Sequence, residues 1–313
     1  MLAVTDLPVP FGWFQVAWPD DVAPGAVRPL FAFGRHLVLW RDLEGAPHLH
    51  DAFCPHLGAH LGHGGRVEGT AIVCPFHGWG FDGDGHHCSL PGGELAHPAP
   101  PIRTYPVVEG NGLVMAWYHP EDDPPTWEIP EVPELAGPDH VAPRVREFLV
   151  DAPLQEMAEN GADSAHFGFV HGQATVPSID SYDTDGPVAR MRSTQRWPTG
   201  DGFVDAFVEA TSHGPGFSVI RMTGIIDTVS VGCNTPVSGD RCHLRFSFAV
   251  RKFDDRAMTQ LVGDAFIDLL TEQIQEDIRI WEHKRYLPHP ALASTDGPIT
   301  QFRSWASQFY AGT

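Results

Sequence analysis

The stretches Cys54-Pro55-His56 and Cys74-Pro75-Phe76-His77 carry the most information in this sequence of 313 residues. They read C-x-H and, after seventeen intervening residues, C-x-x-H, so each supplies one thiolate and one imidazole. In a Rieske centre, two Cys hold one iron of a [2Fe–2S] cluster and two His hold the other, which raises the reduction potential above that of all-Cys clusters. The two stretches therefore predict a cluster that moves single electrons.

A zinc site is the alternative interpretation of the same four residues, because Cys2His2 zinc sites use the same ligand types. Zinc fingers usually group Cys with Cys and His with His, whereas each stretch here has one of each. Gly58 and Gly78 follow the two stretches. Glycine lets the backbone turn tightly and direct N–H groups at sulfur, so the flanking residues favour the iron–sulfur cluster.

Composition limits the classes of protein to consider. The length suffices for two domains, and a hydrophobic content of 42% with a charged content of 19% is ordinary for a soluble globular protein. A net charge of −20 argues against binding to nucleic acid or an anionic membrane. No apolar run approaches the ~20 residues of a membrane-spanning helix, and the N-terminus lacks the pattern of a secretory signal.

The chain has five Cys, an odd number that does not suggest a disulfide framework. We therefore expect Cys88, Cys233 and Cys242 to be buried free thiols and the protein to be cytoplasmic.

The distribution of apolar residues predicts an α+β protein with two domains. Residues 1–120 are expected to form an all-β domain, because short strand-like runs are separated by Gly, Pro and Asp turns. Residues 121–145 are rich in Pro and acidic residues and are expected to be a linker. Residues 146–313 form the second domain, with a long helix predicted from about 257 to 286. The strand-like runs of this domain, which predict one antiparallel sheet, are 146–150, 189–197, 203–210, 217–226 and 243–250.

His166 and His171 offer a second set of metal ligands, at the end of a predicted helical segment over residues 154–167. On a continuous helix, side chains five residues apart point about 140° apart. We therefore expect the helix to end near Gly168, so that the second imidazole turns back toward the first. Two His and one carboxylate form the facial triad of non-haem Fe(II) oxygenases, which leaves positions open for O2. A histidine pair is weak evidence in a chain with 18 His, but an upstream electron-transfer cluster strengthens it.

Asp277 is the expected carboxylate ligand, because it lies on an apolar stripe of the long predicted helix. An ionised carboxylate on such a stripe is costly unless it is paired or binds a metal. Glu276 and Glu282 lie off the stripe and are expected to be solvated surface charges, although Glu272 and Glu276 remain weaker candidates for the ligand. The other members of the stripe are Leu270, Ile274, Ile278 and Trp281.

Over essentially its whole length, the chain resembles the Rieske non-haem iron oxygenases, and specifically their sterol- and steroid-acting branch of cholesterol 7-desaturases and 3-ketosteroid 9α-hydroxylases. The resemblance implies an N-terminal Rieske domain joined to a C-terminal helix-grip domain, which is an antiparallel sheet with a long C-terminal helix. The stretches that carry it are 51–59, 74–79, 124–131, 155–166 and 277–284.

The resemblance also implies a role for each candidate site residue. Asn160 and Asp163 would be catalytic, and Asp163 matches an aspartate that bridges between subunits; a helix cap or a solvated charge is the alternative for Asp163. The implied metal ligands are Cys54 and Cys74 on one cluster iron, His56 and His77 on the other, and His166, His171 and Asp277 on a mononuclear Fe(II).

The implied activity is O2-dependent hydroxylation or desaturation of an apolar steroid- or sterol-like small molecule. Another polycyclic, terpenoid or aromatic natural product is the alternative substrate. The sequence has no G-x-G-x-x-G dinucleotide fingerprint and no plant-type ferredoxin spacing, so a separate NAD(P)H-dependent reductase or ferredoxin is expected to supply electrons. The family resemblance further implies a head-to-tail homotrimer. The animal desaturases have an N-terminal membrane segment that this sequence lacks, so a soluble homologue is expected.

Two other classes remain open. A pure electron-transfer Rieske protein would need the same cluster, but respiratory Rieske proteins add two Cys where this chain has Ala59 and Phe76. Such a protein would also leave the second domain without a purpose. A non-catalytic scaffold with a degraded iron site is the other possibility, and the presence of all three proposed iron ligands counts against it.

Overall fold

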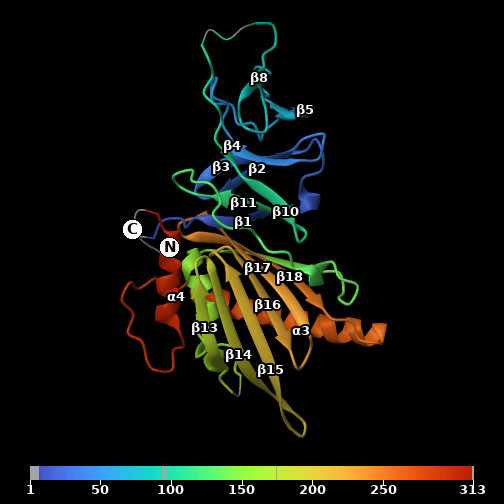
Figure 1. The fold of residues 1–313 in the computed structure, drawn as a ribbon, viewed down its shortest axis with the longest axis vertical. Helices are drawn as coiled ribbons and strands as arrows, with labels where there is room; N and C mark the ends of the chain where they lie inside the picture. The colour runs from blue at the N-terminus through green and yellow to red at the C-terminus, as the bar shows by residue number, and fades with distance from the viewer. Residues whose placement is uncertain (1–6, 94, 96, 174, 312–313) are drawn as a thin grey trace. The chain divides into compact units, whose positions relative to one another are not determined.

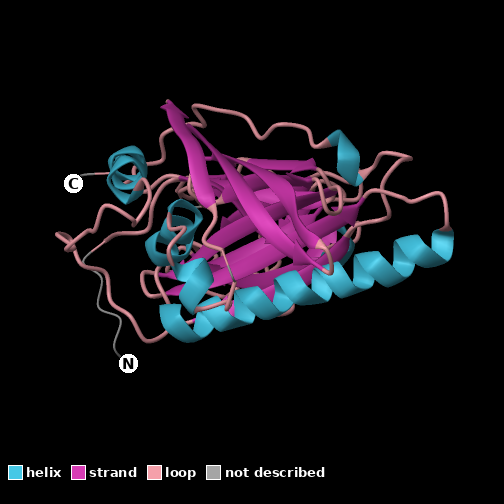
Figure 2. Ribbon diagram, turned by 90° about the horizontal axis from the view of Figure 1, so that it is seen from below, coloured by secondary structure: helices cyan, strands magenta, loops and turns pink. Residues whose placement is uncertain are grey.

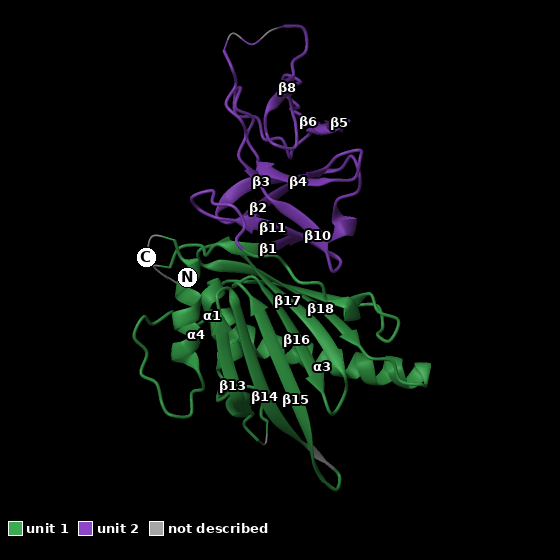
Figure 3. Cartoon of the chain, viewed as in Figure 1, with its two compact units in different colours: residues 1–13, 127–313 green, residues 14–126 purple. Residues whose placement is uncertain are grey.

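The computed structural model of the chain describes residues 7–311, except for residues 94, 96 and 174 (Figure 1). The chain forms two compact units (Figure 3). One unit comprises residues 14–126. The other comprises residues 127–313 together with the described residues that precede Phe14, whereas the sequence-based division assigns that N-terminal segment to the first domain.

The unit of residues 14–126 is built from three small antiparallel sheets, with strand orders β1-β11-β10, β2-β3-β4-β9 and β5-β6-β7-β8. The predicted all-β character is confirmed, because no α-helix occurs among its described residues. Its strands are β1 (Gly12–Ala17), β2 (Val27–Ala32), β3 (Arg35–Arg41), β4 (Pro47–Asp51), β5 (Arg66–Glu68), β6 (Ala71–Val73), β7 (Gly80–Phe81), β8 (His87–Ser89), β9 (Thr104–Tyr105), β10 (Val107–Gly110) and β11 (Leu113–Tyr118).

The other unit is organised around one antiparallel sheet of seven strands, in the order β12-β18-β17-β16-β15-β14-β13. The five predicted strands are present, and two that the sequence analysis did not predict, β13 and β17, complete the sheet. The strands are β12 (Arg144–Val150), β13 (Ser178–Asp185), β14 (Val188–Thr199), β15 (Gly202–His213), β16 (Phe217–Thr223), β17 (Thr228–Ser238) and β18 (Arg241–Val250).

The long helix α3 (Arg256–Trp281) runs along one face of this sheet (Figure 2). It begins where the Asp255 side chain accepts hydrogen bonds from the Ala257 and Met258 N–H groups, at 2.7 and 3.2 Å. Buried Phe266 and Ile267 anchor the helix in a hydrophobic cluster with β16 and β18. The predicted helix is confirmed, although it ends five residues before the expected position.

The described residues of this unit also form three shorter α-helices: α1 (Leu154–Glu159), α2 (His166–Phe169) and α4 (Ile299–Ala306). Helix α4, which the sequence analysis did not predict, packs Phe302 and Trp305 into a buried cluster with Ala162 and Ala189. No described helix is both long and apolar enough to cross a membrane.

All five cysteines are free. Cys233 and Cys242 are buried as expected, but the expectation was wrong for Cys88, which is exposed on the short strand β8.

Candidate metal centres and substrate cavity

The segment before the candidate iron site is a broken helix rather than the continuous one expected over residues 154–167. After α1, a 3-10 turn spans Asn160–Ala162, and the backbone at Asp163 is extended, with φ −99° and ψ 113°. The chain then re-enters a helix at His166 and leaves it after Phe169. The expected end near Gly168 is therefore confirmed, and His171 lies beyond it, free to turn back toward His166.

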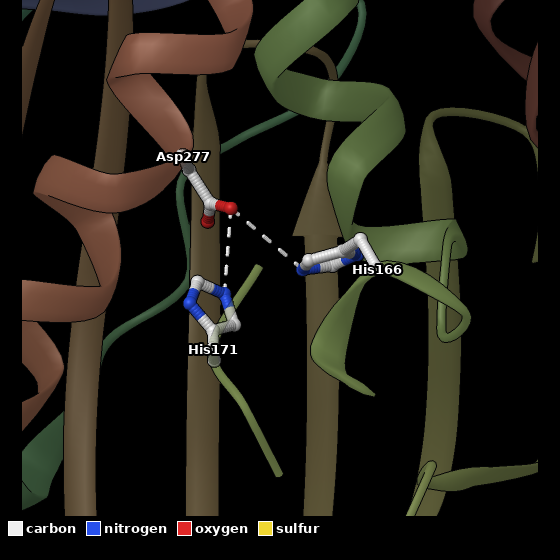
Figure 4. A group of neighbouring side chains, drawn as sticks. All are labelled: His166, His171 and Asp277. Carbon is white, nitrogen blue, oxygen red and sulfur yellow. Dashed lines mark ion pairs between the residues drawn. The ribbon is translucent and has the colours of Figure 1, made fainter. Parts of the chain in front are cut away.

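His166, His171 and Asp277 converge on one point (Figure 4). The Asp277 Oδ1 atom lies 3.3 Å from His171 Nε2 and 3.9 Å from His166 Nε2. One ligand atom from each of the three residues lies within 4.8 Å of the other two, and no other described group of His, Cys, Asp or Glu residues meets this criterion. A single ion with room for further ligands suits this arrangement of two imidazoles and one carboxylate.

Asn160 holds the carboxylate of Asp277 in place. Its Nδ2 donates to Asp277 Oδ2 at 3.1 Å, which leaves Oδ1 facing the two imidazoles. Burial raises the pKa of the Asp277 carboxyl above its ordinary value, while His166, His171 and Asn160 act in the opposite direction. A buried acid with a raised pKa lacks positive charge nearby, and a divalent cation would supply that charge. The donor set and its electrostatics therefore fit a metal ion.

A carboxylate also lies behind each imidazole, at Nδ1. Glu276 Oε2 is 2.8 Å from His171 Nδ1, and Asp163 Oδ2 is 3.6 Å from His166 Nδ1. Burial acts to raise the pKa of Asp163, but His166 and the Ala165 N–H outweigh it and lower the pKa overall.

The contact with His171 corrects the sequence analysis, which assigned Glu276 to the solvated surface. No pattern in the sequence marks this contact, because it depends on where the loop after α2 places the His171 ring. Glu272, the other weaker candidate, is exposed. Glu282, also expected to be a surface charge, is only partly exposed, and its Oε1 accepts a 3.4 Å hydrogen bond from the Asp151 N–H.

The candidate cluster residues lie on two loops of the same design. In the first loop, the Cys54 N–H donates to the Ala59 carbonyl and the Gly58 N–H donates to the Cys54 carbonyl, both at 2.9 Å. In the second loop, the Cys74 N–H donates to the Trp79 carbonyl at 2.8 Å, and the Gly78 N–H donates to the Cys74 carbonyl at 3.1 Å. Both glycines have positive φ, +75° and +72°, which a residue with a Cβ adopts only under strain. The expectation of tight glycine turns at these positions is confirmed.

The four side chains of these loops fit a cluster better than a single ion. Cys54 and Cys74 are buried, and the imidazoles of His56 and His77 lie with their ring centroids 4.6 Å apart. His56 Nδ1 is buried without a hydrogen-bond partner, as expected for an atom that binds a metal. Burial raises the pKa of the Cys54 thiol to about 11, with a further contribution from Cys74, so a bound metal would be needed to hold the thiolate. A single zinc ion would need the ligand atoms of these residues to lie close together. Among the described residues, the four do not form a group of three or more ligand atoms within 4.8 Å of one another, so the geometry does not favour zinc.

A cavity of about 280 Å³ lies beside the candidate iron site and is lined by Asn160, Asp163 and Asp277. Most of its remaining wall is apolar and comes from strands of the seven-stranded sheet and from α1, α3 and α4. A smaller hollow of about 170 Å³ is lined by His171 and Asp277. A larger hollow of about 560 Å³ lies near the N-terminal end of α3, but none of the three ligands lines it. Of the two cavities that candidate iron ligands line, the 280 Å³ cavity is the larger, and Asp277 is the candidate that lines it.

Gln195 supplies one polar group in this cavity wall. The Trp197 Nε1–H, which can only donate, lies 3.2 Å from Gln195 Oε1 and so fixes the orientation of the amide. The Nε2 donors of this buried side chain remain for a ligand in the cavity. The sequence analysis did not identify Gln195, because strand alternation alone does not show which inward position meets a cavity.

Comparison with known families gives two matches that together span most of the chain. Residues 12–106 match the Rieske [2Fe–2S] domain, and residues 116–310 match the 3-ketosteroid 9α-hydroxylase C-terminal domain.

A cholesterol 7-desaturase of Xenopus laevis is 32% identical, over 96% of this chain and 72% of the relative. The oxygenase component of a 3-ketosteroid-9-alpha-monooxygenase of Rhodococcus rhodochrous is 30% identical, over 96% of this chain and 83% of the relative.

Solved structures share the fold. Dicamba monooxygenase bound to 3,6-dichlorosalicylic acid superposes with a TM-score of 0.77 at 20% identity, over 95% of this chain and 96% of the other. A Rieske domain joined to an oxygenase domain with a group of two histidines and one carboxylate defines the class of Rieske non-haem iron oxygenases. Within that class, the chain belongs to the family that has the 3-ketosteroid 9α-hydroxylase C-terminal domain. Its cofactors are a Rieske [2Fe–2S] cluster and a mononuclear iron.

Proposed function

We propose that this protein is the terminal oxygenase component of a system that hydroxylates or desaturates an apolar steroid- or sterol-like molecule. The observation that carries the proposal is the convergence of His166, His171 and Asp277, of which Asp277 also lines a largely apolar cavity of about 280 Å³ that we propose as the substrate site. The named substrates of the relatives, cholesterol and 3-ketosteroids, are rigid apolar molecules of the kind that such a wall accepts. Another polycyclic, terpenoid or aromatic compound is the alternative substrate.

Each cofactor has its proposed ligands on this chain. Cys54, Cys74, His56 and His77 would hold the [2Fe–2S] cluster, and His166, His171 and Asp277 would hold the mononuclear Fe(II). When bound, the cluster would supply single electrons and the ferrous ion would supply open coordination positions for O2.

The surrounding residues determine how a substrate is received. Asn160 keeps Asp277 Oδ2 in a hydrogen bond, so that the carboxylate offers Oδ1 alone to the ligand group. The apolar wall excludes water and orients the substrate by shape, which brings one C–H bond to the ligand group. The Gln195 Nε2 donors suit an oxygen atom of the substrate, such as a carbonyl or hydroxyl group.

The assembly and the electron source are also part of the proposal. We infer a head-to-tail homotrimer in which Asp163 connects the cluster of one subunit to the iron site of the next, and its 3.6 Å distance to His166 supports such a position. A separate NAD(P)H-dependent reductase or ferredoxin supplies the electrons, since a relative is named as the oxygenase component of its system. Five free cysteines support a cytoplasmic location.

Substitution of His166 by Ala tests the proposal, because it removes one iron ligand and leaves intact the unit of residues 14–126, here called the Rieske unit. We expect the wild-type protein to contain three irons per chain and the variant two, with an unchanged Rieske absorbance. Incubation with a surrogate reductase, O2 and a panel of steroids should give a product, detected by mass, from the wild type alone.

His283→Ala serves as the matched control, since that imidazole is exposed just beyond the end of α3 and hydrogen-bonds the Arg279 carbonyl in the last turn of the helix. A His166 variant that keeps three irons and full turnover would refute the iron assignment. A wild type with two irons would instead indicate a pure electron-transfer protein.

A further inference from the structure

The imidazole of His171 lies between two consecutive carboxylates of α3. Asp277 Oδ1 is 3.3 Å from its Nε2 and Glu276 Oε2 is 2.8 Å from its Nδ1. The His171 side chain is 2% exposed, whereas that of Glu276 is 32% exposed. Neighbouring helical residues point about 100° apart, so a ring contacts both only if it lies between their two directions. The loop after α2 places His171 there.

This arrangement selects one form of the imidazole. A neutral imidazole has one N–H and one lone pair, and a carboxylate only accepts hydrogen bonds. The 2.8 Å contact therefore places the N–H on Nδ1, as donor to Glu276. The lone pair of Nε2 then faces Asp277 and the point where the three ligands converge. An anion behind an N–H also makes the opposite nitrogen a stronger electron donor.

The two histidines of the group are held differently. His166 Nδ1 is buried and lies 3.6 Å from Asp163, beyond hydrogen-bond distance. Its Nε2 lies 3.4 Å from the Asn160 amide. His171 has no such competing donor at Nε2 and has a short bond at Nδ1. The interaction that orients an imidazole most firmly is thus the one between Glu276 and His171.

We propose that Glu276 is a positioning residue for the mononuclear iron, which acts by orienting His171 and strengthening its donation through Nε2. The inference rests on the proposed function, because it concerns the same ligand group. It assigns to Glu276 a structural and electrostatic role and leaves direct coordination to Asp277.

Measured affinity for Fe(II) tests the role of Glu276. Loss of a carboxylate behind a metal-binding histidine typically weakens metal affinity 10–100-fold. We expect Glu276→Ala to raise the dissociation constant, measured by chelator competition, by about that factor. Glu276→Gln keeps an acceptor without the charge and should show a smaller loss. The visible spectrum of the Co(II)-substituted protein should change in the Ala variant, because the geometry of His171 changes.

Glu272→Gln is the matched control, since it removes an exposed acidic residue one turn earlier on the same helix. The Fe(II) dissociation constant of Glu272→Gln should equal that of the wild type. All variants should keep the visible absorbance of the Rieske cluster. Wild-type affinity and an unchanged Co(II) spectrum in both Glu276 variants would overturn this inference alone. An equal loss in Glu272→Gln would also overturn it, because net charge would then be the cause. A wild type that binds no Fe(II) would overturn the proposed function as well.

Discussion

The residues of the two candidate metal sites differ in exposure, and the difference suits their chemistry. His77 is exposed, and the neighbouring Leu57 and Phe76 are 65% and 61% exposed. The iron-site side chains of His166, His171 and Asp277 are only 9%, 2% and 11% exposed. An exposed cluster edge allows electrons to arrive from and leave toward other proteins. A buried iron site strengthens the electrostatic interactions among its ligands and keeps water from the substrate.

His50 makes the Rieske unit sensitive to acid. Burial lowers its pKa from 6.5 to about 4, although the hydrogen bond between Nε2 and the Gly83 carbonyl favours the charged form. Because the folded-state pKa lies below the unfolded value, the stabilising contribution is complete above pH 6.5 and is lost as the pH falls toward 4. A difference of this size corresponds to roughly 3 kcal/mol.

We therefore expect the unfolding free energy of the Rieske unit to decrease by roughly 3 kcal/mol between pH 6.5 and pH 4. Urea unfolding, followed by the visible absorbance of the cluster, measures this decrease. In His50→Phe, which does not titrate, the decrease should be smaller. An equally steep pH dependence in His50→Phe would contradict this origin.

At single positions, the sequence indicated candidate ligands more readily than the residues that support them. The four cluster residues and the three iron candidates could be predicted because their chemistry limits them to few residue types and spacings. Glu276 could not, because helical periodicity shows which residues share a face of one helix. It does not show that the His171 ring, from the loop after α2, contacts Glu276. The orientation of the Gln195 amide likewise depends on Trp197, whose role as a donor only becomes visible in the structure.

At the scale of elements, periodicity and length determined what could be predicted. Strand β18 and helix α3 have clear apolar patterns, and both were expected. Strand β13 was missed because it is an edge strand with the polar sequence SIDSYDTD, in which every residue is exposed or only partly buried. Strand β17 was missed because Gly232, Asn234 and Pro236 interrupt its apolar residues. Helix α4 has only eight residues, too few for a periodic signal to stand out.

An ion pair between α1 and α4 stabilises the segment that leads to Asn160. Arg303 Nε and Nη2 donate to the Glu159 carboxylate at 2.6 and 2.9 Å. Glu159 is 8% exposed, so removal of its partner leaves a buried charge. We expect Arg303→Met to lower the unfolding free energy by roughly 3 kcal/mol, and therefore to lower Tm by several degrees.

The exposed pair of Arg192 and Glu209 provides the comparison, and Arg192→Met should cost below about 1 kcal/mol. Calorimetry of both variants measures the difference. Equal shifts in Tm for the two substitutions would contradict a specific role for the pair at α1 and α4.

At the scale of the whole molecule, the proposed trimer makes each active site the product of two chains. Under the proposed assignments, a Cys54→Ser chain lacks a cluster ligand and a His166→Ala chain lacks an iron ligand, so each should be inactive alone. If both assemble at random into closed rings, an active site forms only where an intact cluster faces an intact iron site of the next subunit. Each mixed ring contains one such junction among its three, so the isolated mixed trimers should regain about a third of the wild-type turnover. Co-expression with two different tags isolates the mixed trimers, and native mass spectrometry verifies their composition. Verified mixed trimers without activity would show that electrons pass within one chain, and a monomeric wild type would refute the assembly itself.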